Sequence, residues 1–306
     1  MKIDIADLDT VFLTYNEPNK EEYWVQLKNI IPWAKRVDGV KGSDAAHKAC
    51  AEASNTDRFI VIDGDNIPDE SFFNETLDLS AQDYDKAQFR WRARNSINGL
   101  MYGNGGISSW TKDFVKNMKT HEASTGNDKT DVEFCFDPMY WAMHDCFSTT
   151  YPNQSEFTAW RAGFREGVKM CLNEGTKPSL GDFKMDVQQR NMDNLSIWHN
   201  IGSDVEYGCY AMLGARMGTV KTMLEDWDYK QVQDFEALET IFNTEVHDLP
   251  TQLTVTGYAL KAQLDLQILS PSKENSKFFK HYYMRDWKNR GIMLKEIDAI
   301  RGHEGW

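Results

Sequence analysis

Residues 58–69 read Arg-Phe-Ile-Val-Ile-Asp-Gly-Asp-Asn-Ile-Pro-Asp, and this stretch decides the fold that we expect for the chain. Its apolar run at 59–62 is typical of a strand buried on both faces, as in a parallel sheet. The run ends in an Asp-Gly-Asp turn, and Pro68 stops any continuation. If the backbone stays extended through the glycine, the carboxylates of Asp63 and Asp65 point to the same side. Ligands of open α/β sheets bind beyond the carboxyl ends of the strands, so this pair is a candidate site for Mg²⁺ or Mn²⁺ carrying substrate phosphates.

The acidic pair has a simpler alternative, which is a plain surface turn, because Asp-x-Asp sequences arise by chance in a chain this acidic. An EF-hand calcium loop is excluded, since its required glycine position holds Pro68 and its terminal acid position holds Asn74. The buried strand that precedes the pair favours the metal site.

The composition is that of a soluble globular protein with an acidic surface. The 306 residues are 41% hydrophobic and 26% charged, with a net charge of −13. No apolar run approaches membrane length and the first residues lack a signal-peptide pattern, so we expect a cytoplasmic protein without a membrane partner. Five scattered cysteines without a Cys-x-x-Cys pair indicate reduced thiols. The negative charge argues against a broad nucleic-acid-binding surface and leaves only a local basic groove open.

The residues before this stretch alternate between strand and helix patterns. Residues 9–15 predict a first buried strand, and a helix that begins near Asn19 runs to Pro32. A short strand at 35–40 and a helix from Gly42, with a face of small side chains, complete the pattern. Together these elements predict a doubly wound, nucleotide-binding arrangement. The chain contains no Gly-x-Gly-x-x-Gly after the first strand and no Walker lysine motif, which disfavours nicotinamide and P-loop functions.

Residues 86–94 alternate in a way that predicts a strand with two unlike faces. Arg90, Arg92 and Arg94 share one face, and the apolar side chains between them share the other. This strand is either a solvated edge or a cationic wall that faces phosphate, for which guanidinium geometry is suited.

The next segment, 98–106, holds four glycines in nine residues. So many glycines indicate positive φ angles or close approach of the backbone to another group. The segment is either a plain turn or a ligand-facing loop. In the second case, Asn98, Gly105 and Gly106 would lie against sugar hydroxyls or phosphate.

The rest of the chain offers weaker candidates. Asp131 and Asp137 are possible bases or ordinary surface acids, and His144 is a possible metal ligand or a structural histidine. Arg161 and Arg165 share a stripe of a predicted helix, as a charged flank or as a phosphate clamp. The character of the chain then becomes helical. The C-terminal segment, Lys273 to Arg290, has six basic and two acidic residues interleaved with aromatic ones, as a packed helix or as a groove for a polyanionic acceptor.

Taken in order, these motifs resemble those of glycosyltransferases of the GT-A fold, in particular the glycosyltransferase-like proteins of large tailed phages. The motifs are Tyr-Asn-Glu-Pro at 15–18, Asp-Gly-Asp at 63–65, the glycine segment at 98–106 and Trp-Arg-Ala-Gly-Phe-Arg-Glu at 160–166. The similarity spans roughly residues 9 to 220. The acidic pair alone is a weak signal, and the ordered set is more specific.

The resemblance implies an α/β, GT-A-like (Rossmann-like) mixed and mainly parallel sheet flanked by helices, with a mostly helical C-terminal region. We therefore expect a catalytic core over residues 1–180 and a helical region over 181–306. It further implies transfer of a sugar from a nucleotide-sugar donor, most often a UDP-sugar, with Mn²⁺ or Mg²⁺. Some phage enzymes of this kind attach sugars, including arabinose, to hydroxymethylcytosine in DNA, which would place the reaction in the host cytoplasm.

The resemblance implies roles in donor binding, metal binding and catalysis for three sets of residues. The donor would contact Thr14, Tyr15, Asn16, Glu17, Lys48, Asp63, Asn98, Gly105, Gly106, Arg161 and Arg165. The metal ligands would be Asp63 and Asp65, with His144 as a third. If the reaction inverts the anomeric carbon, Asp137 is the first candidate for the base and Asp131 the second.

Two other functions stay open. A nucleotidyltransferase would use the same fold and metal pair, but a glycine-rich loop with a lysine after the first strand would favour it, and the sequence has none there. A non-catalytic binding or structural protein would tolerate replacement of Asp63 and Asp65 by asparagine.

Overall fold

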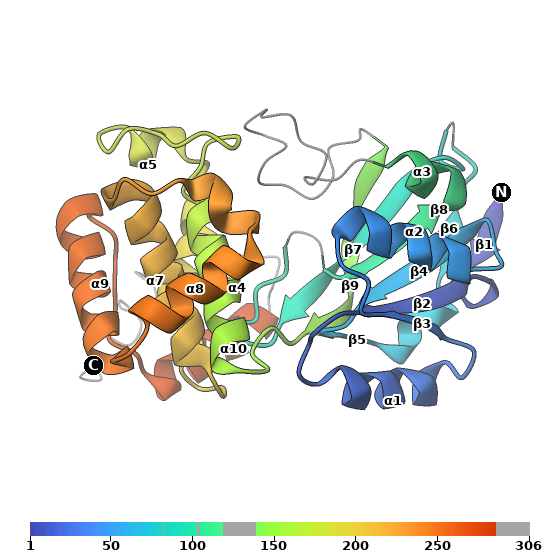
Figure 1. Ribbon diagram of the computed structural model, residues 1–306, viewed down its shortest axis with the longest axis horizontal. Coiled ribbons are helices and arrows are strands. Elements are labelled where there is room, and N and C mark those ends of the chain that lie inside the picture. The colour runs from blue at the N-terminus through green and yellow to red at the C-terminus, as the bar shows by residue number, and fades with distance from the viewer. Residues whose placement is uncertain (82, 103–104, 119–138, 286–306) are drawn as a thin grey trace. The chain divides into compact units, whose positions relative to one another are not determined.

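The computed structural model describes residues 1–81, 83–102, 105–118 and 139–285 of the chain (Figure 1). The chain forms two compact units. The first comprises Met1–Asn95 and Leu100–Tyr151, and the second comprises Ser96–Gly99 and the residues from Pro152 onward. The first unit ends at Tyr151, and the division expected from the sequence is at residue 180.

The first unit is built mainly of strands. They are β1 (Lys2–Asp4), β2 (Asp9–Thr14), β3 (Lys35–Asp38), β4 (Arg58–Asp63), β5 (Asn66–Pro68), β6 (Thr76–Asp78), β7 (Gln88–Asn95), β8 (Ile107–Thr111) and β9 (Tyr140–Thr150). The helices are α1 (Lys20–Ile30), α2 (Ser43–Ala53) and α3 (Lys112–Asn117), with short 3-10 turns at Ile5–Asp7 and Glu70–Asn74. The strands expected at 9–15 and 35–40 and the helices between them are thus present, with ends that differ by a few residues.

Seven strands form one mixed sheet in the order β3-β2-β4-β8-β7-β9-β5. Strand β2 is parallel to β3 and β4, and β7 is parallel to β9. The other three pairings, β4 with β8, β7 with β8 and β5 with β9, are antiparallel. The expectation of a mainly parallel sheet is therefore not confirmed. Among the described residues between β4 and β8 there is no α-helix that could act as the crossover connection that parallel pairing needs.

The sheet must curl to accommodate β5. Only Gly64 and Asp65 separate β4 from β5 along the chain, yet the two strands stand third and seventh in the sheet order. The turn after β4 is consequently enclosed by strands that are distant in sequence, and the backbone N–H of Tyr151 donates to the carbonyl of Asp65 at 2.7 Å.

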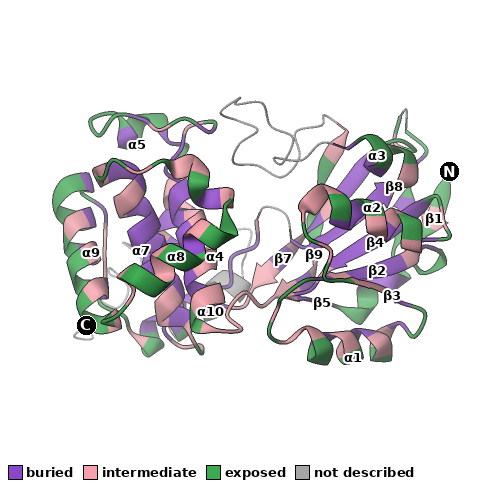
Figure 2. Cartoon of the chain, viewed as in Figure 1, coloured by how far each residue is buried: buried purple, intermediate pink, exposed green. Residues whose placement is uncertain are grey.

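Each face of the sheet has its own apolar core. On the α1 side, Phe12, Leu27 and Ile62 pack together with the buried side chains of β7. On the α2 side, Val61 and Trp110 lie in a second cluster with residues of α2 and α3. Figure 2 shows that β2 and β4 are buried through most of their length. The prediction that β4 is covered on both faces is confirmed.

The second unit is helical. Its helices are α4 (Glu156–Lys169), α5 (Phe183–Asp186), α6 (Gln189–Asn200), α7 (Gly208–Leu224), α8 (Phe235–Glu245), α9 (Leu249–Leu264) and α10 (Lys273–Arg285), with a 3-10 turn at Tyr229–Gln233. At its centre the buried Arg216 donates hydrogen bonds to the backbone carbonyls of His199, Leu253 and Leu269. This cation therefore ties α7 to three other segments without a carboxylate partner among the described residues. Within the described ranges, no helix is long and apolar enough to cross a bilayer.

Candidate functional site

The candidate site lies at the carboxyl end of β4, where the strand ends in Asp63. The backbone N–H of Asp63 donates to the carbonyl of Gly106 at 2.8 Å, which holds the end of β4 against the glycine segment. Burial is the main cause that raises the pKa of the Asp63 carboxyl to about 8, and the neighbouring charges of Asp65 and Glu17 contribute to the same rise. A carboxyl group held in that state favours an added positive charge beside it.

A third acid approaches from the loop after β2. The carboxylate of Glu17 accepts a hydrogen bond from the backbone N–H of Tyr15 at 2.7 Å, which orients it. A Cβ added to Gly64 would lie 2.8 Å from Oε2 of Glu17 and 2.9 Å from the Thr14 methyl group. The loop therefore packs directly on the turn between the two aspartates. A side chain at position 64 would require Glu17 or the Thr14 methyl group to move.

The end of the glycine segment forms the opposite wall. Gly106 has a φ of +78°, and a Cβ there would lie 2.6 Å from Nδ2 of Asn66 and 3.2 Å from Oδ2 of Asp63. The Asn66 amide donates to the carbonyl of Gly105. Its Oδ1 is buried and has no hydrogen-bond partner among the described residues. The backbone of Gly105-Gly106 thus passes close to Asp63 with no side chain of its own in between.

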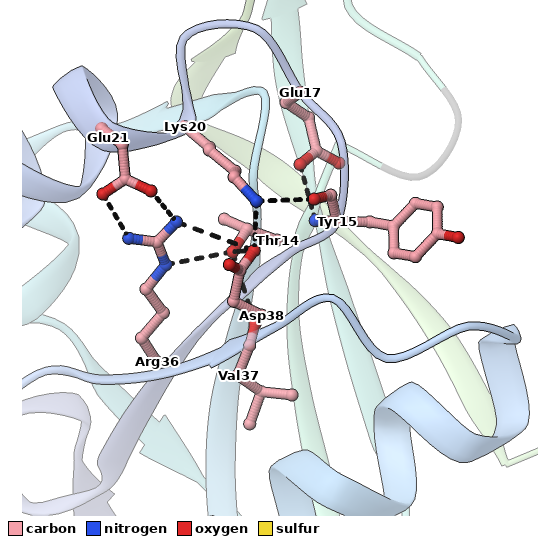
Figure 3. A network of polar contacts seen from close by, with 8 residues as sticks. All are labelled: Thr14, Tyr15, Glu17, Lys20, Glu21, Arg36, Val37 and Asp38. Carbon is pink, nitrogen blue, oxygen red and sulfur yellow. Dashed lines mark hydrogen bonds and ion pairs between the residues drawn. The ribbon is translucent and has the colours of Figure 1, made fainter.

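A polar network occupies the carboxyl ends of β2 and β3 (Figure 3). Asp38 accepts hydrogen bonds from Thr14 and from Lys20, each at 2.7 Å, and these two bonds hold the pKa of its carboxyl below the ordinary value, that of Lys20 contributing most. The Lys20 ammonium also donates to the carbonyl of Tyr15 at 2.7 Å. Arg36 donates to both oxygens of Glu21, at 2.7 Å each, and to Thr14 at 3.1 Å.

This network fixes the course of the loop that brings Glu17 to the acidic turn. Lys20 ties the backbone at Tyr15 to the end of β3, and the Tyr15 ring itself is 45% exposed and points away from the network (Figure 3). Thr14 is buried and fully engaged, so it acts through the loop rather than as an open contact. The exposed ring of Tyr15 is available for stacking.

The remaining sequence candidates are distributed over both units and over residues outside the described ranges. Asn16 is exposed in the same loop, and Lys48 is exposed on α2. Asn98 is buried and belongs to the second unit. Arg161 and Arg165 are also in the second unit, on α4, and their guanidinium groups lie over the Phe235 ring at 4.5 and 5.0 Å from its centroid. Asp131 and Asp137 fall outside the described residues.

His144, the predicted third metal ligand, is not part of a three-ligand group with the acidic pair in the described part of the chain. His144 is exposed on β9, seven residues from Tyr151, whose backbone meets Asp65. At the rise of an extended strand this is on the order of 20 Å along β9. In the described part of the chain, no group of three or more His, Cys, Asp or Glu side chains is arranged to hold a metal ion. A hard divalent cation between Asp63 and Asp65 would have to complete its ligands with water and substrate phosphates, as Mg²⁺ commonly does.

The sequence analysis missed Lys20, Asp38 and Asn66. Lys20 and Asp38 are eighteen residues apart and meet only because β2 and β3 pair in parallel, Thr14 opposite Asp38. Asn66 directly follows the acidic pair. A polar residue at the start of a short strand was the feature of the sequence that could have indicated its role.

No protein-family model matches the chain, and neither does any curated protein. Among solved structures, the chain is similar to a glycosyltransferase involved in the glycosylation of the major capsid of PBCV-1. The two are 14% identical, and the alignment covers 48% of this chain and 94% of that one with a TM-score of 0.31. A likeness of this size does not assign the chain to a family.

Proposed function

We propose that the chain is a metal-dependent glycosyltransferase that uses a nucleotide-sugar donor, most simply a UDP-sugar. The observation that carries the proposal is the convergence of Asp63, Asp65 and Glu17 at the end of a buried strand, with a raised pKa at Asp63 and a side-chain-free backbone at Gly105-Gly106 beside it. A surface turn gains nothing from such an arrangement, because mutually repelling carboxylates destabilise it.

The residues of the site would have the following roles. Asp63 and Asp65 would hold a divalent cation, which supplies positive charge to the departing diphosphate. The loop at 15–17 would contact the nucleoside, with the exposed Tyr15 ring as a stacking surface. The backbone of Gly105-Gly106 would leave room for the sugar next to Asp63. Lys48, Arg161 and Arg165 stay proposed phosphate contacts, and Asp137 or Asp131 stays the proposed base of an inverting reaction.

The acceptor proposed from the resemblance is hydroxymethylcytosine in DNA. Incubation of the protein with hydroxymethylcytosine-containing DNA and a panel of UDP-sugars, followed by mass measurement of the nucleosides, tests it. A gain of one pentose or hexose unit supports the DNA acceptor. The absence of any adduct across the donors, in a protein that still binds UDP, points to another acceptor.

The donor and metal are tested by thermal unfolding with nucleotides and nucleotide sugars, each with and without Mn²⁺. We expect UDP with Mn²⁺ to raise Tm by several degrees, because a ligand that binds only the folded state stabilises it. Asp65→Asn should lose this increase. The matched control is Asp69→Asn, the same chemical change at an exposed position four residues along the chain, and it should keep the increase.

Two outcomes would replace the proposal. Stabilisation by nucleoside triphosphates and not by UDP would favour a nucleotidyltransferase. Indifference to every nucleotide, equal in the natural protein and in Asp65→Asn, would favour a non-catalytic role. The structure itself disfavours the nucleotidyltransferase, because the loop after β2 presents the acid Glu17 to the site.

A further inference from the structure

Strand β7 carries an arginine row, defined as Arg90, Arg92 and Arg94, on the face opposite to its buried apolar side chains. Phe89 and Trp91 are buried in the core on the α1 side, whereas the three arginines are only partly covered. The alternation that the sequence predicted is thus confirmed, and the two explanations for it were a solvated edge and an anion-facing wall. β7 is not an edge strand, since it pairs with both β8 and β9.

Two members of the row have no carboxylate partner among the residues that the structure describes. No acid in the described ranges forms an ion pair with Arg90 or Arg94, and the Nε atom of each is buried without a hydrogen-bond partner among those residues. The Arg90 guanidinium lies over the Tyr140 ring, 5.2 Å from its centroid. Buried guanidinium groups are normally paired or hydrogen-bonded, because unpaired burial of a charge is costly.

Other arginines of the same unit show how such groups are usually satisfied. Arg36 forms a two-pronged pair with Glu21, at 2.7 Å for each bond. Arg58 donates to Oγ of Ser109 at 3.1 Å and to the carbonyl of Asp85 at 2.8 Å. Within the described part of the first unit, Arg90 and Arg94 therefore differ from Arg36 and Arg58, whose guanidinium groups have carboxylate, hydroxyl or carbonyl partners.

The arginine row and the acidic pair lie on the same face of the sheet. Arg90 is paired with Ser108 of β8, and Ser108 is paired with Val61 of β4, so all three side chains project to one side. By alternation along β4, Asp63 projects to that side as well. β7 and β4 are both neighbours of β8, which puts the row about 10 Å from the acidic strand at the usual spacing of paired strands.

Gly105 and Gly106 lie between the acidic pair and the arginine row. Gly106 bonds to the backbone of Asp63, and the N–H of Gly105 donates to the carbonyl of Trp91 in β7 at 3.0 Å. Across this face of the sheet, the acidic pair is therefore followed by Gly105-Gly106 and then by the arginine row. In the reaction proposed above, this is the order of the donor diphosphate with its cation, the sugar, and the molecule that receives the sugar.

We propose that the arginine row is an anion-binding subsite that takes a phosphate or carboxylate group of the acceptor. The assignment of this group to the acceptor rests on the proposed function, since the diphosphate of the donor would be balanced on the far side of the glycines. The binding of an anion by Arg90 and Arg94 does not rest on it. Guanidinium groups bind both kinds of anion through paired, charge-assisted hydrogen bonds.

The test measures anion binding alone, with a chelator present and no nucleotide. Inorganic phosphate and acetate are titrated separately against the full chain at constant ionic strength, and binding is followed by thermal unfolding. We expect saturable stabilisation, weakened roughly tenfold or more in affinity by Arg90→Gln combined with Arg94→Gln, as expected for loss of charge-assisted hydrogen bonds. A stronger response to phosphate indicates a phosphorylated acceptor, and a stronger response to acetate indicates a carboxylate-bearing one.

The matched control is Lys86→Gln, which removes one positive charge from an exposed side chain just before β7. It should leave anion affinity unchanged. Equal affinity in the double variant and the natural protein, or an equal loss in Lys86→Gln, overturns the subsite. Circular dichroism confirms that the double variant is folded, and the two single variants are measured if it is not. A chain that binds anions at Arg90 and Arg94 but ignores UDP with Mn²⁺ would keep the subsite and lose the glycosyltransferase.

Discussion

At the scale of single residues, Asp63 shows how an acidic site costs stability. Its carboxyl group is partly buried near two other acids, and its pKa of about 8 means that the folded chain keeps a proton there in neutral solution. In the unfolded chain the same carboxyl loses its proton near pH 3.8. The free energy of unfolding therefore falls as the pH rises from about 3.8 to about 8, because the unfolded state binds fewer protons in that range.

We predict that Asp63→Asn stabilises the first unit at pH 8. Because the amide cannot ionise, the free energy of unfolding of the variant should not decrease between pH 5 and pH 8 as it does with the carboxyl group. Its Tm at pH 8 should therefore exceed that of the natural chain by roughly 5 °C. Thermal unfolding across this pH range, without metal, is the measurement. Asp69→Asn is the control and should follow the natural chain at every pH. A lower Tm for Asp63→Asn at pH 8 would contradict the raised pKa.

Some residues of the site can be predicted from the sequence immediately around them, and others cannot. Asp63 and Asp65 follow a recognisable buried strand, so the end of β4 was predictable from a dozen residues. The approach of Glu17 to Gly64 and the bonding of Lys20 to Asp38 depend on a loop conformation and a strand pairing that no short pattern encodes. The position of His144 within β9 likewise depends on where that strand lies in the sheet, which its residue type does not reveal.

At the scale of elements, the packing of α4 on α7 shows that the glycines of α7 are structural. A Cβ added to Gly214 would lie 2.0 Å from the carbonyl oxygen of Trp160 in α4. Backbone atoms cannot move aside as a flexible side chain can, so the two helices would have to separate.

We predict that Gly214→Ala destabilises the second unit by about 2–3 kcal/mol, the size of an overpacking effect. The sign is informative, because the same change inside an unobstructed helix stabilises by about 1 kcal/mol. Urea unfolding followed by circular dichroism gives the value. Gly181→Ala is the control, since a Cβ there meets only Oγ of Ser179 at 3.9 Å, and it should stay within about 0.5 kcal/mol of the natural chain.

Strand direction was the element-scale feature that the sequence did not reveal. The alternation of β7 and the apolar run of β4 each identify a strand and its faces, because side-chain period is a local property. Whether β8 runs parallel or antiparallel to β4 depends on the connection between them, and the glycine segment could be interpreted as either a turn or a ligand loop.

At the scale of the whole molecule, the two units have titrating groups that act in opposite directions. In the second unit, burial and the nearby Arg216 lower the pKa of His199 to about 3, and its Nε2 lies 2.9 Å from Oγ1 of Thr219. The unfolded chain takes up a proton at this histidine below pH 6.5, which the folded chain does not do until about pH 3. The free energy of unfolding of the second unit therefore falls as the pH falls through this window. In the first unit, Asp63 makes it fall as the pH rises.

We therefore predict that the second unit loses stability as the pH falls, whereas the first unit loses stability as the pH rises. Hydrogen exchange measured by mass spectrometry should show protection of α6 and α7 decreasing between pH 6.5 and pH 4, and protection of β4 decreasing between pH 5 and pH 8, once intrinsic exchange rates are divided out. His199→Gln keeps a partner for Thr219 without a titrating ring. It should remove the decrease in protection of α6 and α7 at acidic pH and leave the protection of β4 unchanged. If both units instead lose protection together at every pH, they unfold as one cooperative body, and neither buried group sets the stability of its own unit.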